Sequence, residues 1–304
     1  MEMIMKKVLL MCLTIVVAHQ YRAQQDAQFT LYMINGQTLN PAYISSFDGA
    51  QANIQYRNQW ASWNGAPRNV VVNGSMDYLN HRMASGINFS TDKIGVFTKS
   101  SVAIDQSYRI QTPLFNWSFG LRASLDQVSG QFSQLNLSPD GRIDQSLGGD
   151  WSKTTFNMGA GTYLNSNNWW VGVVIPRFVR NQLSSTGAQE VIHRYVSAGY
   201  VFGQNRTFQV KPSILYKSTK GINPSIDYNL SFYYKEKIGL GIGKRSNDSF
   251  KLLAEWIIKD SIQLAYGYDV TTSALKTYAA SSHEILIRYS MNQKSVQHHS
   301  PRLF

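Results

Sequence analysis

The stretch WSFGLRASLD, residues 117–126, alternates between apolar side chains and small or polar ones. Trp117 and Phe119 share one parity, whereas Arg122 and Asp126 share the other. Successive side chains of a β-strand point to opposite faces of the sheet, so a period of two predicts a strand with one apolar face. The fold therefore depends on how often this pattern recurs and on which face meets solvent.

The same period dominates the chain from residue 50 onward, and no segment with the helical period of 3.6 interrupts it. The chain is thus predicted to be all-β, with about fourteen strands joined in sequence. The predicted strands lie near residues 51–60, 69–77, 84–90, 101–110, 117–125, 154–163, 169–175, 195–202, 207–216, 224–233, 237–243, 250–257, 261–269 and 283–291.

Connection lengths distinguish a membrane barrel from a soluble sandwich. Connections after even-numbered strands are short, whereas most of those after odd-numbered strands are longer, namely 91–100, 126–153, 176–194 and 270–282. Outer-membrane barrels have short periplasmic turns and long outward loops, with an apolar face toward lipid. We therefore predict a transmembrane up-and-down antiparallel β-barrel over residues 51–291, in the bacterial outer membrane and in contact with its lipid.

The flanking segments lack this alternation. Residues 1–23 have two lysines before an apolar run and are predicted to be a signal peptide. Residues 24–50 are predicted to be a periplasmic N-terminal segment, although they could also lie across the barrel mouth, enter the lumen or bind another protein. Residues 292–304 form a polar C-terminal tail.

Composition excludes several classes of function. The single cysteine, Cys12, lies in the predicted signal peptide, which excludes a disulfide framework and a cysteine-based metal or catalytic site from the mature chain. The formal net charge is +11, but the lysines and arginines are scattered rather than clustered. We therefore expect no nucleic-acid partner.

Charged residues on the polar parity are predicted to face the barrel lumen. They could pair with one another and brace the wall, or they could line a polar conduit or a docking surface for an inserted segment. The predicted lumen charges are Arg57, Asp105, Arg109, Arg122, Asp126, Asp227, Glu255, Asp269, Glu284 and Arg288.

Aromatic side chains near strand ends are predicted to lie at the membrane interfaces, where tryptophan and tyrosine are enriched. The stretch QYRNQWASWNGAP, residues 55–67, ends a strand in two tryptophans and then breaks at a Gly-Ala-Pro turn. The predicted interfacial aromatics are Trp60, Trp63, Trp117, Trp256 and Tyr268.

One short motif has the residue types of an acyl-transfer site. Ser282, His283 and Glu284 are adjacent, but neighbouring strand residues point to opposite faces, so Ser282 and His283 could not act together. We expect a non-enzymatic protein with no catalytic, cofactor or metal site.

Several motifs in order resemble the PorP/SprF family of outer-membrane proteins, and the resemblance covers residues 24–291. The motifs are QQDAQFTLYMINGQTLNPAY (24–43), YRNQW (56–60), GAP (65–67), DKIG (92–95), YRI (108–110), SFGLRA (118–123), HRYVSAGYVF (193–202), KPSILYK (211–217), GYDVTTSAL (267–275) and SSHEILIRY (281–289).

This resemblance implies a barrel that works with the type IX secretion system and assists secretion or surface attachment of a specific large protein, such as an adhesin. The implied partners are a secreted protein with a type IX C-terminal signal domain, and periplasmic or outer-membrane components of the secretion system. Coupling to gliding motility is also implied. The alternative hypothesis is an outer-membrane porin or hydrophobic-solute transporter.

Overall fold

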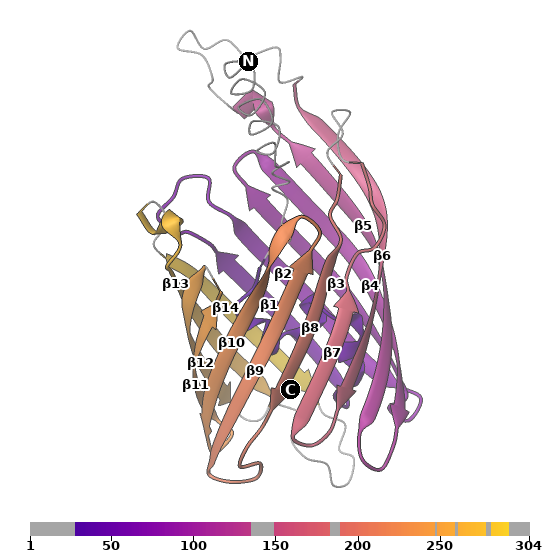
Figure 1. Cartoon of the computed structure of the whole chain (residues 1–304). Coiled ribbons are helices and arrows are strands. Elements are labelled where there is room, and N and C mark those ends of the chain that lie inside the picture. Colours follow the sequence, from indigo (N-terminus) through magenta and orange to yellow (C-terminus); the bar gives the residue numbers. More distant parts are fainter. Residues whose placement is uncertain are drawn as a thin grey trace, which may run out of the picture.

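The computed structural model describes residues 28–134, 149–182, 189–246, 248–258, 261–277 and 281–291. Fourteen antiparallel strands close into one barrel, in which each strand pairs with its neighbours in the chain and β1 pairs with β14 (Figure 1). The predicted all-β up-and-down barrel of fourteen strands is therefore confirmed. Among the described residues, no helix is long and apolar enough to cross a membrane.

The strands run from Ala50 to Met291. Their bounds are β1 Ala50–Asn58, β2 Arg68–Tyr78, β3 Met83–Ile94, β4 Phe97–Gln111, β5 Asn116–Gly130, β6 Trp151–Asn165, β7 Trp169–Ile175, β8 His193–Tyr200, β9 Phe208–Thr219, β10 Ile222–Tyr234, β11 Ile238–Arg245, β12 Ser249–Ile258, β13 Ile262–Thr271 and β14 Ser281–Met291. Short 3-10 helices are η1 Leu31–Met33, η2 Gly36–Thr38, η3 Pro41–Ser45, η4 Phe132–Gln134 and η6 Ala274–Thr277.

The seam between β1 and β14 closes the sheet in continuous register, from Ala50 opposite Met291 to Arg57 opposite Glu284. Closure satisfies the backbone hydrogen-bonding groups that an open sheet would expose to lipid. The same register places Arg57 and Glu284 beside each other on the lumen face.

The two faces of the wall differ as the alternation requires. Along β5, Trp117, Phe119 and Leu121 are exposed on the outer face, whereas Ser118 and Arg122 are buried on the inner face. Because a membrane barrel turns its apolar face to lipid, this arrangement matches a bacterial outer-membrane protein. The short turns then lie in the periplasm and the longer connections face outward.

One predicted outward loop is wrong. Residues 91–100 were predicted to be a long connection, but β3 continues to Ile94 and β4 begins at Phe97, which leaves a two-residue turn. Residues 90–93 and 98–101 of this hairpin are polar on both faces, so they lack the alternation of a lipid-facing strand. The long outward connections are 131–150 and 176–192.

The segment before the barrel lies inside it. Residues 28–49 form η1, η2 and η3, and η3 contacts the inner walls of β4, β5 and β6. The prediction that residues 24–50 are periplasmic is therefore wrong for the described residues, because their apolar side chains are buried against the barrel wall. The predicted signal peptide 1–23 and tail 292–304 lie outside the described residues.

Local sequence explains how this lumen segment, residues 28–49, stays compact. Asn40 caps η3, since its side-chain oxygen accepts a hydrogen bond from the Ala42 N–H at 2.9 Å. Pro41 occupies the first helical position, where its lack of an N–H removes no helical hydrogen bond. Gly36 packs against the Tyr43 ring so closely that a Cβ would lie 2.5 Å from it.

The wall is uneven between β6 and β8. β5 pairs with β6 over its whole length, but β7 pairs only with Ala160–Asn165 of β6. In Figure 1 the upper ends of β5 and β6 rise well above those of β9 to β13. The outward half of β6, residues 151–159, therefore has no strand partner on its β7 side among the described residues.

Candidate functional site

The lumen segment has two apolar anchors. Leu31 is fully buried and belongs to a cluster with Leu215, Leu253 and Leu286 of the wall. At the other end, the Tyr43 ring packs edge-on against Tyr163, with 5.6 Å between ring centroids. Burying these side chains removes apolar surface from water, which favours the inserted position of the segment.

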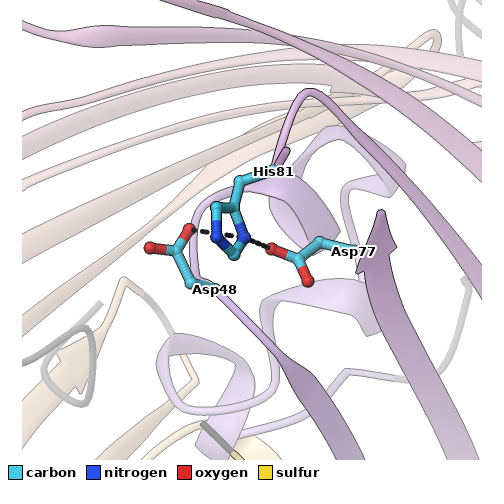
Figure 2. Close-up of side chains that lie close together, drawn as sticks. All are labelled: Asp48, Asp77 and His81. Atoms are coloured by element: carbon cyan, nitrogen blue, oxygen red, sulfur yellow. Dashed lines mark hydrogen bonds and ion pairs between the residues drawn. The ribbon is translucent and has the colours of Figure 1, made fainter. Parts of the chain in front are cut away.

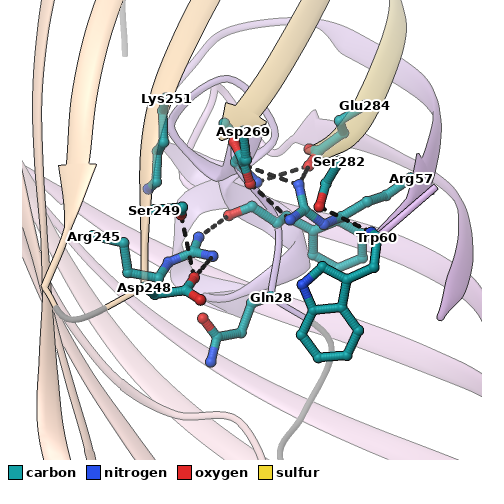
Figure 3. A network of polar contacts seen from close by, with 12 residues as sticks. Gln28, Arg57, Trp60, Arg245, Asp248, Ser249, Lys251, Asp269, Ser282 and Glu284 are labelled. Carbon is teal, nitrogen blue, oxygen red and sulfur yellow. Dashed lines mark hydrogen bonds and ion pairs between the residues drawn. The ribbon is translucent and has the colours of Figure 1, made fainter. Parts of the chain in front are cut away.

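Glu284 anchors the start of the segment (Figure 3). Its carboxylate accepts hydrogen bonds from the backbone N–H groups of Thr30 and Leu31, at 2.7 and 2.9 Å. It also accepts bonds from Gln55 at 2.7 Å and from Arg57 at 2.8 Å. This fully buried charge thus has four donors, two of them from the lumen segment.

Asp269 extends the same network. The second terminal nitrogen of Arg57 donates to Asp269 at 2.7 Å. The Thr30 hydroxyl donates to Asp269 at 2.7 Å and accepts from Arg57 at 2.9 Å. Three strands and the lumen segment are therefore joined by one set of charge-assisted hydrogen bonds, which are stronger than neutral ones.

Asp227 is surrounded by three cations. Its carboxylate lies 2.6 Å from the Lys251 ammonium, 3.1 Å from that of Lys217 and 3.1 Å from Arg245. Arg245 also donates to the Phe29 carbonyl at 3.4 Å. Figure 3 shows Arg245 and Lys251 on the same side of the lumen as Asp269.

Asp105 and Arg122 hold the middle of the segment. Arg122 binds both carboxylate oxygens of Asp105, at 2.6 and 2.8 Å, and donates to the Gln37 carbonyl at 2.6 Å. The Gln37 side chain donates back to Asp105 at 3.1 Å. Both charges and the inserted glutamine therefore have partners without water.

Two more of the predicted lumen charges, Glu255 and Arg288, have separate sets of partners. Glu255 accepts hydrogen bonds from Tyr233 and Gln263, at 3.0 and 2.9 Å. Arg288 donates to Asn53 at 2.9 Å and to the Ile34 carbonyl of the lumen segment. These contacts place Arg288 among the residues that grip the segment.

Arg109 and Asp126 lie at opposite ends of the lumen. Arg109 donates to Asp48 at 2.7 Å, near the periplasmic exit of the segment. Asp126 lies 3.0 Å from Arg177 on the outward side and accepts a hydrogen bond from the Ser101 hydroxyl. All ten predicted lumen charges are buried, and the structure gives each of them a polar partner.

Sequence reasoning missed three cations of the network, namely Lys217, Arg245 and Lys251. Lys251 and Arg245 are buried and share the inward parity of their strands. The alternation could therefore have identified them. The donors from the segment, such as Thr30 and Gln37, had no comparable signal.

A cavity of about 390 Å³ lies on the outward side of the segment. Its apolar lining includes Phe29, Leu39, Ala103 and Val128, and its polar lining includes Arg177. Connection 176–192 borders it and is tied to the wall, since Asn157 exchanges two hydrogen bonds of 3.0 Å with the Val179 backbone. The lumen segment thus fills the lumen on the periplasmic side of this cavity.

The predicted interfacial aromatics lie at both ends of the barrel. Trp60 and Trp63 follow β1 at the outward end, with their ring centroids 6.2 Å apart, and Tyr268 lies near the outward end of β13. Trp117 and Trp256 are exposed on the outer face, near the periplasmic ends of β5 and β12.

The Ser282-His283-Glu284 motif does not converge. Ser282 is buried and accepts a hydrogen bond from the Trp60 N–H at 3.1 Å, whereas His283 contacts the Tyr266 hydroxyl on the outer face at 2.6 Å. The serine and the imidazole therefore lie on opposite faces of the wall, where no proton could pass directly between them.

Comparisons with known proteins agree with this architecture. The family model described as type IX secretion system membrane protein PorP/SprF matches residues 21–289. No curated protein matches the sequence. The CymD monoaromatic hydrocarbon channel is similar in fold, with a TM-score of 0.52 and 12% identity over 86% of this chain and 94% of that chain.

Two other solved structures are similar to a lesser degree. A FadL homologue of Pseudomonas aeruginosa has a TM-score of 0.46 and 11% identity, over 83% of this chain and 92% of that chain. The outer-membrane protein Omp33 of Acinetobacter baumannii has a TM-score of 0.45 and 8% identity, over 80% and 98%.

Proposed function

Because the chain belongs to the PorP/SprF family of type IX secretion system membrane proteins, we propose that it acts as a plugged adaptor barrel. In this role it assists the secretion or cell-surface attachment of one exported protein and conducts no solute. The exported protein carries a type IX C-terminal signal domain. A large adhesin is the proposed class, and gliding motility is the proposed setting.

The lumen segment is the observation that carries this proposal. Residues 28–49 are tied to the wall through Glu284, Asp269, Asp105 and Arg288, and their apolar side chains are buried. Opening a pore would expose or unpair these groups, and removing one partner of a buried ion pair costs about 3–5 kcal/mol. A sealed lumen suits an adaptor better than a channel.

The outward connections supply the proposed recognition surface for the exported protein. Connections 131–150 and 176–192 are the longest on that side and flank the outward half of β6. An unpaired strand edge can add an extended segment of a partner through backbone hydrogen bonds. Partner choice would then come from the connections, and part of the affinity from the edge.

The secretion apparatus would meet a different surface. Since residues 28–49 lie inside the barrel, they cannot serve as a free periplasmic arm. The short turns and the exit of the segment near Asp48 are the described surfaces that remain for a periplasmic component. No catalytic role is proposed, because Ser282 and His283 lie on opposite faces.

A loop exchange tests the proposal. Connections 131–150 and 176–192 are replaced by those of a paralogue, and cell-surface proteins are then compared by mass spectrometry. The matched control exchanges the periplasmic turn 112–115. We expect the outward exchange to change which protein is secreted or retained, with barrel insertion unaffected. Unchanged substrate choice would remove the support for outward recognition.

Solute transport is a second candidate because of the outward cavity of about 390 Å³ with apolar lining. Binding of naphthalene, followed by its fluorescence, tests it. Ala103→Trp would fill the cavity, whereas Ala123→Trp on the outer face of β5 is the control. Saturable binding lost only in Ala103→Trp, together with solute uptake into liposomes, would favour the transporter. An adaptor gives no uptake.

A further inference from the structure

Three side chains of types that can bind a metal ion converge where the lumen segment leaves the barrel (Figure 2). Asp48 is the last residue but one of the segment, Asp77 lies on β2, and His81 lies in the turn between β2 and β3. One ligand atom from each lies within 4.8 Å of the others. From this geometry we propose that the three residues form a binding site for a borderline divalent transition metal, with Zn²⁺ as the reference ion.

The donor set fits such an ion. Imidazole nitrogen and carboxylate oxygens are common zinc ligands, whereas Ca²⁺ and Mg²⁺ prefer oxygen ligands alone. The His81 Nδ1 atom lies 3.8 Å from Asp48 and is in contact with Asp77. Neighbouring ligand atoms of a tetrahedral zinc lie about 3.4 Å apart. A small outward shift of the His81 ring would therefore admit the ion.

Surrounding groups hold the carboxylates in place. Asp48 accepts a hydrogen bond from Arg109 at 2.7 Å, and Arg109 also donates to the His81 carbonyl at 2.7 Å. Asp77 accepts the Gly49 N–H at 3.0 Å through one oxygen, while its other oxygen faces His81. Hydrogen bonds of this kind orient the side chains that bind the ion in metal sites.

Charge and access also favour a cation. The two carboxylates carry −2, and Arg109 supplies +1, which leaves an excess of one negative charge when His81 is neutral. The Asp77 side chain is 2% exposed, so this excess lies partly away from water. Asp48 and His81 are 31% and 25% exposed, which leaves the site open to the periplasm.

A bound ion would fasten the lumen segment to the wall. Asp48 belongs to the segment, whereas Asp77 and His81 belong to the β2–β3 hairpin, so one ion would add a link between the end of the segment and this hairpin. Binding to the folded state alone stabilises that state in proportion to the logarithm of free metal. The site is independent of the proposed adaptor function.

Zinc titration of the full-length barrel in detergent tests the site. The protein is first treated with EDTA, and competition with a fluorescent zinc indicator measures affinity. All proteins carry H298N and H299N, because adjacent histidines in the tail can bind zinc themselves. We expect one zinc per barrel, an affinity reduced at least tenfold in His81→Asn, and little binding of Mg²⁺ or Ca²⁺.

The variants are chosen to fold. His81 has a φ of +62°, a conformation that asparagine tolerates, so His81→Asn removes the imidazole without forcing the turn. His283→Asn is the matched control, because that histidine lies on the outer face at the opposite end. Asp48→Asn should abolish the zinc-dependent rise in melting temperature. Equal zinc affinity in His81→Asn, or no saturable binding to the parent, would overturn the proposal.

Discussion

Two sides of the barrel differ in strand pairing and in the partners of their polar groups. Where β13, β14 and β1 meet, pairing is continuous and Glu284 and Asp269 are fully engaged with Arg57 and the lumen segment. Where β6 passes the end of β7, the sheet is incomplete and connection 176–192 covers part of the inner face. The first side holds the segment that we propose seals the lumen, whereas the second leaves an edge and a cavity toward the outside.

The difference indicates that two parts of the wall have different structural roles. Buried ion pairs at the sealed side fix the position of the segment, because removing one partner leaves the other charge buried and without a counter-charge. At the incomplete side, Phe178 donates its N–H to the Met158 carbonyl and Asn181 donates to that of Phe156. Farther out, residues 151–155 of β6 pair with β5 but have no strand partner on the β7 side among the described residues.

The largest expected contrast comes from two glutamates. Glu284→Ala removes four hydrogen bonds and one of the two carboxylates paired with the buried Arg57, so the free energy of unfolding should fall by about 3–5 kcal/mol. Glu190→Ala removes a 2.9 Å pair with the partly exposed Lys99, together with hydrogen bonds from Asn157 and Asn181 at 3.0 and 2.9 Å, and should cost about 2 kcal/mol. Urea unfolding from detergent micelles measures both.

Glu284→Gln separates charge from shape in this pair. It keeps the side-chain volume and should retain part of the stability lost in Glu284→Ala. If Glu284→Ala and Glu190→Ala lowered the free energy of unfolding equally, the two sides of the barrel would be equally stabilised. That result would contradict the difference described above.

Two glycines on neighbouring strands give the next contrast. A Cβ on Gly120 would lie 2.2 Å from the Ala42 nitrogen, so Gly120→Ala must displace the backbone of the lumen segment. A Cβ on Gly159 would lie 2.1 Å from the Pro176 carbonyl oxygen, so Gly159→Ala must displace connection 176–192. Each should cost about 3 kcal/mol, at the upper end of ordinary overpacking.

Their consequences should differ in kind. In planar bilayers, Gly120→Ala should give ion conductance because the segment no longer fits, whereas Gly159→Ala should stay silent. Gly74→Ala is the control, since its Cβ would lie 3.3 Å from the Gln51 carbonyl oxygen and away from the segment. Conductance in Gly159→Ala alone would show that connection 176–192, and not the lumen segment, closes the lumen.

Proline substitutions at adjacent positions test the incomplete edge. The carbonyls of Met158 and Phe156 point away from β5, so Thr154 shares that direction, whereas Thr155 faces β5 opposite Asp126. Thr155→Pro removes a ladder hydrogen bond and should cost about 2 kcal/mol, whereas Thr154→Pro should cost less than about 1 kcal/mol. Similar losses in urea unfolding would show that the edge is paired.

Sequence reasoning found the walls but not the contents of the lumen. Alternation is a local property, so the parity of Arg57, Asp105 and Arg288 could be read before their partners were known. The lumen segment has no period of two or 3.6, because its short 3-10 helices touch different strands in turn. Its place follows from contacts with residues far away in the chain, such as Thr30 with Glu284.

The proposed metal site illustrates the same limit. Asp77 and His81 are near neighbours in the sequence, but Asp48 joins them only because the segment leaves the lumen beside their hairpin. The prediction of a long connection over residues 91–100, in place of the turn at residues 95–96, was wrong for another reason. Asp92 and Lys93 lie at the outward end of β3, where lipid no longer imposes an apolar face.

The smallest expected effect concerns the base of connection 131–150. The exposed Asp150 carboxylate accepts the Ser133 N–H and hydroxyl, each at 2.8 Å. These hydrogen bonds from Ser133 lower the pKa of Asp150 below its usual value. Hydrogen exchange at the Ser133 amide, corrected for intrinsic rates, should show constant protection from pH 8 to 5 in the parent protein.

The sign of the pH dependence follows from the lowered pKa of Asp150. A carboxyl group whose pKa is lower in the folded protein stabilises the contact between Ser133 and Asp150 at any pH above its pKa in the unfolded chain, about 3.9. That stabilisation is lost as the pH falls further. Protection of Ser133 should therefore decline below about pH 4, and Asp150→Asn should remove the decline. The Thr30 amide, bound to Glu284 inside the lumen, is the internal reference. If Ser133 were protected as strongly as Thr30, the outward end would be as closed to water as the sealed side, and the distinction between the two would disappear.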